Sequence, residues 1–435
     1  MIGNQPQKSS LESFEPAYLV TLDEIFHSPW AAGKRQRMFF LREAVSDFWP
    51  NGHPSRLIHV TGTNGKGSVI HYLEQGFPAR TGSWTGPHVF DYAERFHIDG
   101  KIVGHEEIVR IYRETLLPYQ DHFIKKYPGN ALSFAELGIL LALHLFEKYK
   151  VEWGMMEVGA GGRYTPLMAL DMAACILTNV GEDHPQTLGA EPWQRALEKA
   201  GIARPGIPFF TAAEEPTLEY VRKAAQTEGA AVHVLQPQEI DALGIPADKE
   251  PAFKRRNLAL ACKVIKYFYP NFELNPSRIT GHLPARFWLV EPNIIADVAH
   301  NVNKISKLAE QLKIAYPGRK FRFLLGLSRS RNVREVFAPI LELAEHIVMT
   351  GASYAGLPPT ELAALLSQDF NAVEAIPNPA EALEIEKNRL KTGDILILTG
   401  SAYMIDQALN PNPYLKHLNA TFGRRVNGLT KTNPS

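Results

Sequence analysis

A short segment near the start of the chain joins a strand-like apolar run to a glycine-rich turn that carries a lysine and a hydroxyl group. Residues 58–69 read Ile-His-Val-Thr-Gly-Thr-Asn-Gly-Lys-Gly-Ser-Val. The glycines permit positive φ angles and turn several backbone N–H groups toward one point. Lys66 adds a mobile positive charge, and a helix that begins here directs its N-terminus at the same point. The pattern predicts a cradle for the phosphates of a nucleoside triphosphate.

Polar groups follow two further apolar runs, where parallel strands would end. Glu157 lies in the run 153–159, and Asp183 and His184 come after the run 173–180. Ligands of open parallel sheets gather at this edge. A carboxylate such as Glu157 can hold Mg²⁺ there, directly or through water, and Asp183 with His184 can supply a second metal site or relay a proton. Taken singly, each also fits a structural role such as a capped turn.

A second series of apolar runs begins near residue 290 and repeats this arrangement. Asp297 and His300 follow its first expected strand, and Arg286 lies slightly upstream, near the expected domain junction. A cleft between two α/β units with such groups facing it suits a reaction of two substrates. Lys199 lies at the end of an expected helix, where the residues alone predict only neutralisation of the helix dipole.

Alternating strand and helix patterns predict βαβ units and a parallel sheet in each of two domains. After about fifty helical residues, the expected strands are 57–61, 153–159, 173–180, 207–211, 231–235, 293–298, 321–327, 346–350 and 394–399. The expected helices are 67–75, 131–148, 193–201, 258–268, 302–315 and 332–344. We place the domains at 1–283 and 284–420, followed by a polar, flexible tail at 421–435.

The composition narrows the class of protein. The 435 residues include 46 Lys and Arg against 46 Asp and Glu, a balance that argues against nucleic-acid and membrane partners. Cys175 and Cys262 lie in apolar runs, which predicts buried free thiols. The chain shows neither an apolar signal region nor a run of transmembrane length, so we expect a cytoplasmic protein.

Six motifs in the same order, within roughly residues 18–410, resemble the folylpolyglutamate synthase/dihydrofolate synthase branch of the Mur ligase superfamily. They are Thr61–Ser68, Glu157–Arg163, Asp183-His184, Glu198–Ile202, Asp297–Asn301 and Gly400-Ser401. The resemblance implies a central parallel-sheet domain with a phosphate loop, followed by a smaller Rossmann-like α/β domain. It also implies a monomer.

The activity implied by the resemblance is that of an ATP-dependent amide ligase. ATP phosphorylates a small-molecule carboxylate, and the amine of an amino acid, glutamate in this family, attacks the acyl phosphate. The implied ATP-binding residues are Thr63, Asn64, Gly65, Lys66, Gly67, Ser68, Asn257, Arg286, Asp297 and His300.

The same resemblance implies two Mg²⁺ ions, held by Glu157, His184 and Lys199 as its carbamate. The catalytic residues would be Lys66, Lys199, Asp183 and His184. Phosphoryl transfer to a carboxylate brings two anions together, so catalysis consists mostly of charge neutralisation and positioning.

The acceptor pocket implied by the resemblance comprises His88, Ser133, Phe134, Arg163, Tyr164 and Thr165. Here the chain departs from the family. Gly86 stands where the family has a serine that binds Mg²⁺, and 164–168 read Tyr-Thr-Pro-Leu-Met in place of Leu-Asp-Ala-Thr-Asn. Glu182 adds a charge beside the expected metals. We expect a serine restored at position 86 to leave activity intact or to lower the Mg²⁺ requirement.

Three functions remain open on this basis. The first is a folate-type ligase that adds glutamate to a pteroate or folate carboxylate. The second is a ligase of the same mechanism that acts on a non-folate acid. The third is a nucleotide-binding regulatory protein without catalysis, which Gly86 supports and Glu157, Lys199 and His184 oppose.

Overall fold

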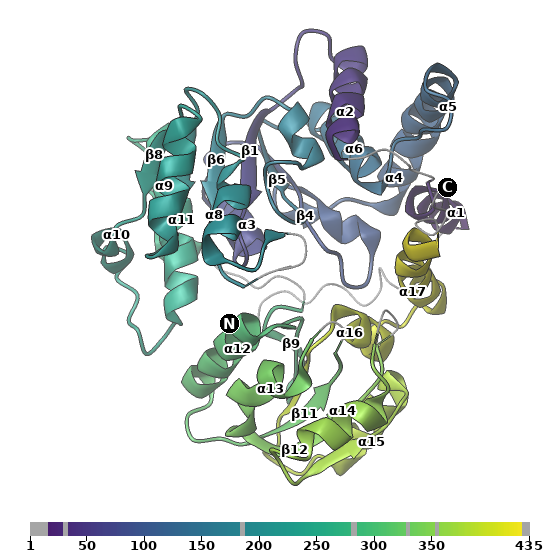
Figure 1. The fold of residues 1–435 in the computed structure, drawn as a ribbon, viewed down its shortest axis with the longest axis vertical. Helices are drawn as coiled ribbons and strands as arrows, with labels where there is room; N and C mark the ends of the chain where they lie inside the picture. The colour runs from purple at the N-terminus through teal and green to yellow at the C-terminus, as the bar shows by residue number, and fades with distance from the viewer. Residues whose placement is uncertain are drawn as a thin grey trace.

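The computed structural model describes residues 16–28, 34–182, 188–279, 285–327, 331–352 and 356–428. Two α/β lobes, each with its own sheet, lie one above the other in Figure 1. The first sheet ends at Val234 and the second begins at Trp288, on either side of the expected boundary near residue 283.

The sheet of the first lobe has eight strands in the order β4-β3-β2-β5-β1-β6-β7-β8. Strands β2, β5, β1, β6, β7 and β8 run parallel, whereas β3 and β4 form an antiparallel extension beside β2. The strands are β1 (Arg56–Thr61), β2 (Thr81–Trp84), β3 (Phe96–Ile98), β4 (Lys101–Ile102), β5 (Trp153–Glu157), β6 (Ala174–Leu177), β7 (Pro208–Thr211) and β8 (Ala231–Val234).

Helices cover both faces of this sheet, so its central strands are buried along almost their whole length. Within β1, Ile58 and Val60 pack on the face covered by α3 (Lys66–Gly76) and α11 (Ala252–Phe268). Leu57 belongs to the larger core on the opposite face. The elements on that side include α1 (Pro16–Phe26), α2 (Lys34–Phe48), α4 (His105–Ile111), α5 (Leu117–Lys126), α6 (Phe134–Lys148), α8 (Pro192–Ala200) and α9 (Thr217–Thr227). The short helix α10 (Pro237–Asp241) precedes α11.

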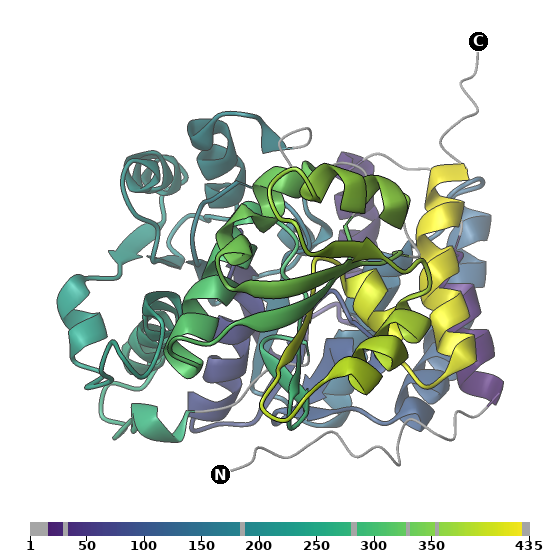
Figure 2. The ribbon, with the colours of Figure 1, turned by 90° about the horizontal axis from the view of Figure 1, so that it is seen from below.

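The second sheet has six strands in the order β13-β12-β11-β14-β10-β9, of which only β9 runs antiparallel to its neighbour. The strands are β9 (Trp288–Glu291), β10 (Ile294–Asp297), β11 (Phe321–Leu325), β12 (Ala344–Met349), β13 (Val373–Ala375) and β14 (Leu396–Thr399). The helices are α12 (Val302–Ala315), α13 (Val333–Leu341), α14 (Pro359–Leu366), α15 (Pro379–Arg389) and α16 (Ala402–Leu409). Apolar clusters fill both faces, with α12 to α14 on one and α15 and α16 on the other (Figure 2).

The expected α/β architecture and its central strands are confirmed, with ends shifted by a few residues. Both sheets are mixed rather than wholly parallel, and the sequence patterns missed β2, β3, β4, β9 and β13 together with the helices α4, α5, α9, α10, α14, α15 and α16. These strands have two to four residues. Such short segments contain too few side chains to display a period of two.

The C-terminal segment corrects another expectation. Helix α17 (Pro413–Gly428) continues through 421–428, where we expected a flexible tail, and 429–435 lie outside the described residues. Leu415 and Leu418 are buried in the core of the first lobe, and α17 packs against α1. This anchoring by tertiary contacts overrides the polar composition of the segment. The last helix of the chain therefore returns to the first lobe.

Two smaller features of the described residues bear on earlier expectations. Cys175 and Cys262 are buried and free, as their apolar surroundings predict. Burial raises the pKa of both thiols, to about 12 and about 11 respectively. None of the helices in the described ranges is long and apolar enough to cross a membrane.

A buried ion pair joins β11 to α15 in the second lobe. Arg322 donates from Nε and Nη2 to the two carboxylate oxygens of Glu386, at 2.8 and 2.9 Å. Glu386 is 0% exposed and also accepts a hydrogen bond from Arg389. His346 and Glu374 lie beside it, but Arg389 also bonds to Glu374, so arginines already neutralise these carboxylates.

We expect Arg322→Leu to lower the free energy of unfolding by about 3–5 kcal/mol, because it leaves a buried carboxylate without its main partner. Arg322→Leu combined with Glu386→Leu should cost less than the single change. Arg334→Leu is the control, since its ion pair with Asp369 is more exposed, and it should lower the free energy of unfolding much less than Arg322→Leu does. Urea denaturation measures all three. A double variant less stable than Arg322→Leu would contradict this account.

Candidate active site between the two lobes

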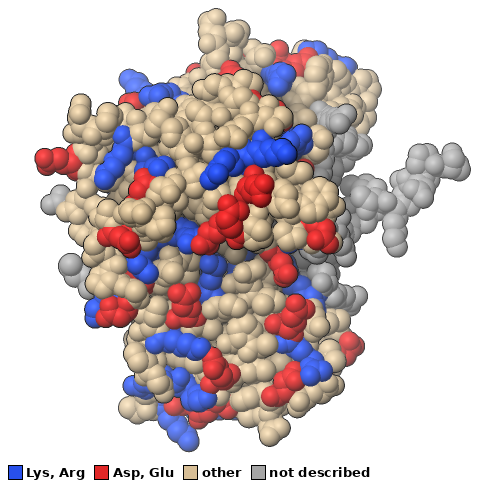
Figure 3. All heavy atoms as spheres, turned by 60° about the vertical axis from the view of Figure 1, so that its left-hand side comes forward, with Lys and Arg blue, Asp and Glu red and all other residues tan. Residues whose placement is uncertain are grey.

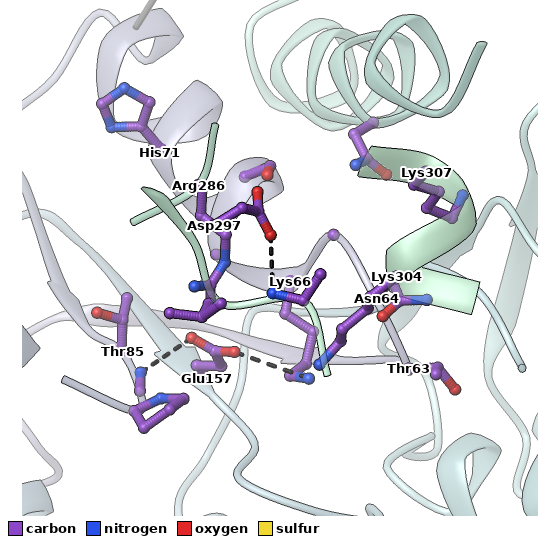
Figure 4. A pocket seen from close by; sticks show the side chains of 18 of the residues that line it. Thr63, Asn64, Lys66, His71, Thr85, Glu157, Arg286, Asp297, Lys304 and Lys307 are labelled. Atoms are coloured by element: carbon purple, nitrogen blue, oxygen red, sulfur yellow. Dashed lines mark hydrogen bonds and ion pairs between the residues drawn. The ribbon is translucent and has the colours of Figure 1, made fainter. Parts of the chain in front are cut away.

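A cavity of about 400 Å³ lies between the two lobes and is lined by residues from both. Its walls include the loop 63–68, the loop 85–89, the end of β5, parts of α11 and α12, and the segment 297–300 after β10. Figure 4 shows side chains from the two lobes converging on this space. Each strand contributes its C-terminal end, which is where open α/β sheets place their ligands.

The glycine-rich loop adopts the conformation that its sequence predicts. Gly62 and Gly65 have φ angles of 144° and 82°, and α3 begins at Lys66. Neighbouring side chains also require glycine, because a Cβ at Gly65 would lie 2.6 Å from the carboxamide of Asn257. Lys66 reaches back across the loop, where its Nζ donates to the carbonyl of Gly62 at 3.1 Å. The first amides of α3 have no partner within the helix and can bind an anion.

The turn after β6 is hydrogen-bonded to the backbone and side chains of the phosphate loop. The carboxamide of Asn179 receives a hydrogen bond from the Asn64 amide and donates one to the Asn64 carbonyl, both at 3.0 Å. Thr178 donates to the same carbonyl at 2.6 Å, and the Thr63 hydroxyl accepts from the Gly181 amide at 2.9 Å. The sequence showed a polar Thr-Asn pair after a strand. Its role depends on β6 pairing with β1, which no local pattern reveals.

Glu157 lies at the end of β5 between the phosphate-loop lysine and the loop that carries Thr85 (Figure 4). Its Oε2 accepts from the Gly86 amide at 3.0 Å, and its Oε1 lies 3.8 Å from Lys66 Nζ. The carboxylate is mostly buried and lines the cavity. The carboxylate oxygens of Glu157 are ligands of the kind that Mg²⁺ prefers, and they lie close to the phosphate loop. They therefore fit a Mg²⁺ ion at this position.

The second lobe contributes Arg286 and Asp297, which project into the cavity side by side (Figure 4). The Asp297 carboxylate accepts from the amides of Phe287 and Ala299, at 2.8 and 2.7 Å. Burial raises the pKa of Asp297, and the nearby Arg286 guanidinium opposes this shift. Burial likewise lowers the pKa of Arg286, while Asp297 and Glu157 counteract the effect.

His300 also lines the cavity, but in a neutral form. Its Nδ1 donates to the Val298 carbonyl at 2.7 Å, and its Nε2 accepts from Lys304 Nζ at 3.3 Å. Burial, together with the charge of Lys304, holds the pKa of His300 well below its usual value. The imidazole thus orients Lys304 and does not add a charge of its own.

Positive charge predominates around the cavity. Five lysine and arginine side chains line it against three carboxylates, those of Glu94, Glu157 and Asp297. Sequence patterns missed three of the cations, namely Lys254, Lys304 and Lys307, because lysines on amphipathic helices are common and carry no motif. In contrast, both signs are interspersed over the outer face in Figure 3. The arrangement favours a polyanion in the cleft.

The corner of the cavity at Gly86 differs from what we expected. A Cβ at this position would lie 2.5 Å from Nη1 of Arg95. The Arg95 guanidinium packs over the ring of Phe134, and its Nε donates to His88 at 2.8 Å. Because Arg95 is held on two sides, it cannot withdraw freely. A serine at position 86 would displace it, which argues against the expectation that this change leaves activity intact.

The residues expected around the acceptor substrate fall into two groups. His88, Ser133 and Phe134 lie together near Arg95, where Ser133 caps α6 and receives a hydrogen bond from Arg37. None of the six expected residues, these three included, lines the cavity. Arg163 pairs with Glu228 near the surface, Thr165 donates to the carbonyl of Gly162, and Tyr164 lies between them in the chain. Their role toward an acceptor stays a prediction.

Lys199 is 1% exposed in the last turn of α8 and does not line the cavity. The turn after β5 packs against this helix end, since a Cβ at Gly162 would lie 2.7 Å from the carbonyls of Glu198 and Lys199. The lysine is thereby kept near the loop that follows Glu157. Asp183 and His184, predicted as metal and catalytic residues, lie outside the described residues.

Comparisons with known proteins agree with this architecture. Residues 285–402 match the family described as Mur ligase, glutamate ligase domain. The chain is 24% identical over 398 residues to the dihydrofolate synthase/folylpolyglutamate synthase of Bacillus subtilis (strain 168), a match that covers 81% of this chain and 90% of that protein.

Solved structures share the fold over both lobes. The folylpolyglutamate synthase of Mycobacterium tuberculosis complexed with ADP superposes with a TM-score of 0.77 at 22% identity, covering 96% of this chain and 99% of the other. The bifunctional folylpolyglutamate synthase/dihydrofolate synthase of Yersinia pestis complexed with AMPPNP and Mn ion gives a TM-score of 0.73 at 23% identity, covering 93% of this chain and 98% of the other. The two lobes in this order, with the phosphate loop facing the second lobe, thus share the fold of these solved structures, and the second lobe matches the Mur ligase, glutamate ligase domain.

Proposed function

We propose that the protein is an ATP-dependent carboxylate–amine ligase that joins glutamate to a folate-type acid. One observation carries this proposal. The cavity brings the phosphate loop and Glu157 of the first lobe face to face with Arg286 and Asp297 of the second. A site divided in this way can close on a nucleotide and an acid together and exclude water from a reactive intermediate.

The nucleotide would lie along the phosphate loop. Its phosphates fit the N-terminus of α3 and Lys66, where backbone amides and a cation converge. The wall also contains Tyr72, Phe253 and Leu308, whose aromatic and aliphatic surfaces suit a nucleoside base. The ADP and AMPPNP bound by the Mycobacterium tuberculosis and Yersinia pestis proteins support this placement.

The described residues also fit a divalent metal. Glu157 would be the ligand, and Lys199, as its carbamate, would supply further negative charge with His184 at a second metal. When bound, the metal neutralises charge on the transferred phosphoryl group. The Mn ion bound by the Yersinia pestis protein supports a divalent cation at this place.

The residues of this chain then act mainly by placing charge. A carboxylate oxygen of the acid attacks the γ-phosphorus, the bond to ADP breaks, and an acyl phosphate forms. Lys66 and Arg286 compensate the negative charge that the two anions bring together. The amine nitrogen of glutamate then attacks the acyl carbon, loses a proton and expels phosphate. We propose that the protein acts as a monomer.

The acid can be identified by an activity assay. We expect release of ADP when the protein is incubated with ATP, Mg²⁺, glutamate and dihydropteroate or tetrahydrofolate, with the amide product detected by mass spectrometry. Turnover only with other acids would contradict the proposed folate substrate but would support the proposed ligase reaction. ATP binding without turnover across a broad panel of acids and amines would overturn the ligase proposal.

Lys66→Ala should lower kcat/KM for ATP by at least about 10²–10³-fold, because it removes a charge that compensates the transferred phosphoryl group. The control is Lys223→Ala on the exposed face of α9, which should retain full activity. Steady-state ADP release measures both. Activity within threefold of the wild type in Lys66→Ala would exclude the proposed phosphate-loop role.

The carbamate proposal makes a separate prediction. Lys199→Ala should lower kcat at least about 10²-fold, and added formate or acetate should partly restore it by supplying a carboxylate at the same place. Lys66→Ala serves as the comparison, since a short acid cannot replace its positive charge. Full activity in Lys199→Ala, without any need for rescue, would remove the carbamate from the mechanism.

A further inference from the structure

A partly buried hydrogen-bond chain connects the C-terminal helix to the Gly86 corner of the cavity. It runs from Asp406 of α16 through Asn419 of α17 and His88 to Arg95, and so joins residues more than three hundred positions apart. None of these residues belongs to the phosphate loop. The hydrogen bonds cross from the second lobe to the first through the last helix (Figures 1 and 2).

The hydrogen-bond partners of His88 determine which of its ring nitrogens carries the proton. Arg95 Nε can only donate, so His88 Nδ1, 2.8 Å away, must accept. His88 Nε2 therefore carries the proton and donates to Asn419 Oδ1 at 3.2 Å. Burial, with a contribution from the charge of Arg95, lowers the pKa of His88 to about 3. The ring is thus neutral, in the Nε2–H tautomer.

Asparagine is the side chain that this position requires. Its Oδ1 accepts from His88, while its Nδ2 donates to Asp406 at 3.2 Å and to the Phe90 carbonyl at 3.1 Å. Asn410 donates to the same two acceptors, at 2.7 and 3.2 Å. Asp406 and the Phe90 carbonyl are thereby satisfied in a buried environment. A carboxylate at position 419 would place a second negative charge beside Asp406.

Arg95, at the other end of these hydrogen bonds, lies beside the cavity wall. Its guanidinium packs over the ring of Phe134 at 4.9 Å and lies against Gly86, which lines the cavity and whose amide binds Glu157. Its Nη1 makes one long contact, 3.4 Å, with the Thr85 carbonyl. Within the described part of the chain no hydrogen bond is assigned to Nη2, and the residue is partly exposed. A guanidinium that is held by Nε and only weakly by Nη1 can donate from Nη2 to a carboxylate.

We propose that Asn419 is a positioning residue for the acceptor acid: through neutral His88 it directs Arg95 to the Gly86–Glu157 corner, where Arg95 binds the anionic acceptor. This rests on the proposed ligase function. Gly86 has a defined part in it, because only a residue without a side chain leaves room for the guanidinium. The guanidinium of Arg95 occupies the space that a side chain at position 86 would need.

The kinetic test separates binding of the acid from binding of ATP. Asn419→Leu should lower kcat/KM for the acid that supports turnover by about 10- to 100-fold, as expected when a charged group loses its orienting hydrogen bonds. The Kd for ATP, measured without acid, should change less than twofold. Gly86→Ala should resemble Asn419→Leu, since its Cβ displaces the same guanidinium. An equal loss of ATP affinity and of kcat/KM for the acid would overturn the proposal. It would indicate that the substitution disturbs the packing of the two lobes in general.

Two further variants test the coupling. Asn412→Ala removes a side chain that accepts from the amides of Tyr414 and Leu415 at the start of α17, without touching the chain of hydrogen bonds. It should leave kcat/KM for the acid within threefold. In an Arg95→Lys background, Asn419→Leu should change kcat/KM less than threefold, because its effect passes through Arg95. Independent, multiplicative effects of the two changes would contradict the proposal.

A measurement on the unmodified protein does not depend on any activity. ¹⁵N NMR of histidine side chains, with His88 assigned by its loss in His88→Asn, should show the neutral Nε2–H tautomer at pH 7 in the full chain. An imidazolium or the Nδ1–H tautomer would overturn the inference, since Nδ1 could not accept from Arg95. If no acid supports turnover but this tautomer is found, the proposed function is wrong, whereas the hydrogen bonds from Asn419 through His88 to Arg95 are confirmed.

Discussion

The structure depends on an electrostatic requirement: positive charge from two lobes must meet in one cleft without forcing the lobes apart. Lys66 comes from the first lobe, and Arg286 and Lys304 come from the second. Glu157 and Asp297 lie among them, which reduces the mutual repulsion in the empty cleft but does not cancel it. The remaining positive charge can be neutralised by a polyanion, so binding of a nucleotide and approach of the lobes favour one another.

The position of the phosphate loop in this cleft depends on the neighbouring strands of the first sheet. Its conformation depends on Asn179 and Thr178, which bind the backbone of Asn64 from the turn after β6. These contacts exist only because β6 lies beside β1 in the parallel sheet. On the other side of β1, strand β5 brings Glu157 to the same edge. Three neighbouring strand ends thus form one rigid platform, and rigidity is what electrostatic catalysis demands of charged groups.

Local sequence predicted the parts of the molecule that carry periodicity or a motif. The phosphate loop, Glu157, Asp297 and Arg286 all line the cleft, and the central strands lie within a few residues of their expected ends. Contacts between distant segments could not be predicted, since no periodicity encodes them. Asn419 is such a case: its partners, His88 and Asp406, are set by the packing of α17 across both lobes. Arg163 shows the converse, because a motif residue can face away from the cavity.

The C-terminal helix shows why matched motifs alone do not delimit a site. The Mur ligase domain match ends at residue 402, yet α17 begins at Pro413 and packs against the first lobe. Leu415 and Leu418 are buried in the core of the first lobe, and Asn419, Asn410 and Asp406 are buried with hydrogen-bond partners. Those hydrogen bonds offset the desolvation of the polar groups, so the network adds orientation more than net stability. The orientation reaches Arg95 through His88, and Arg95 lies against Gly86 in the cavity wall.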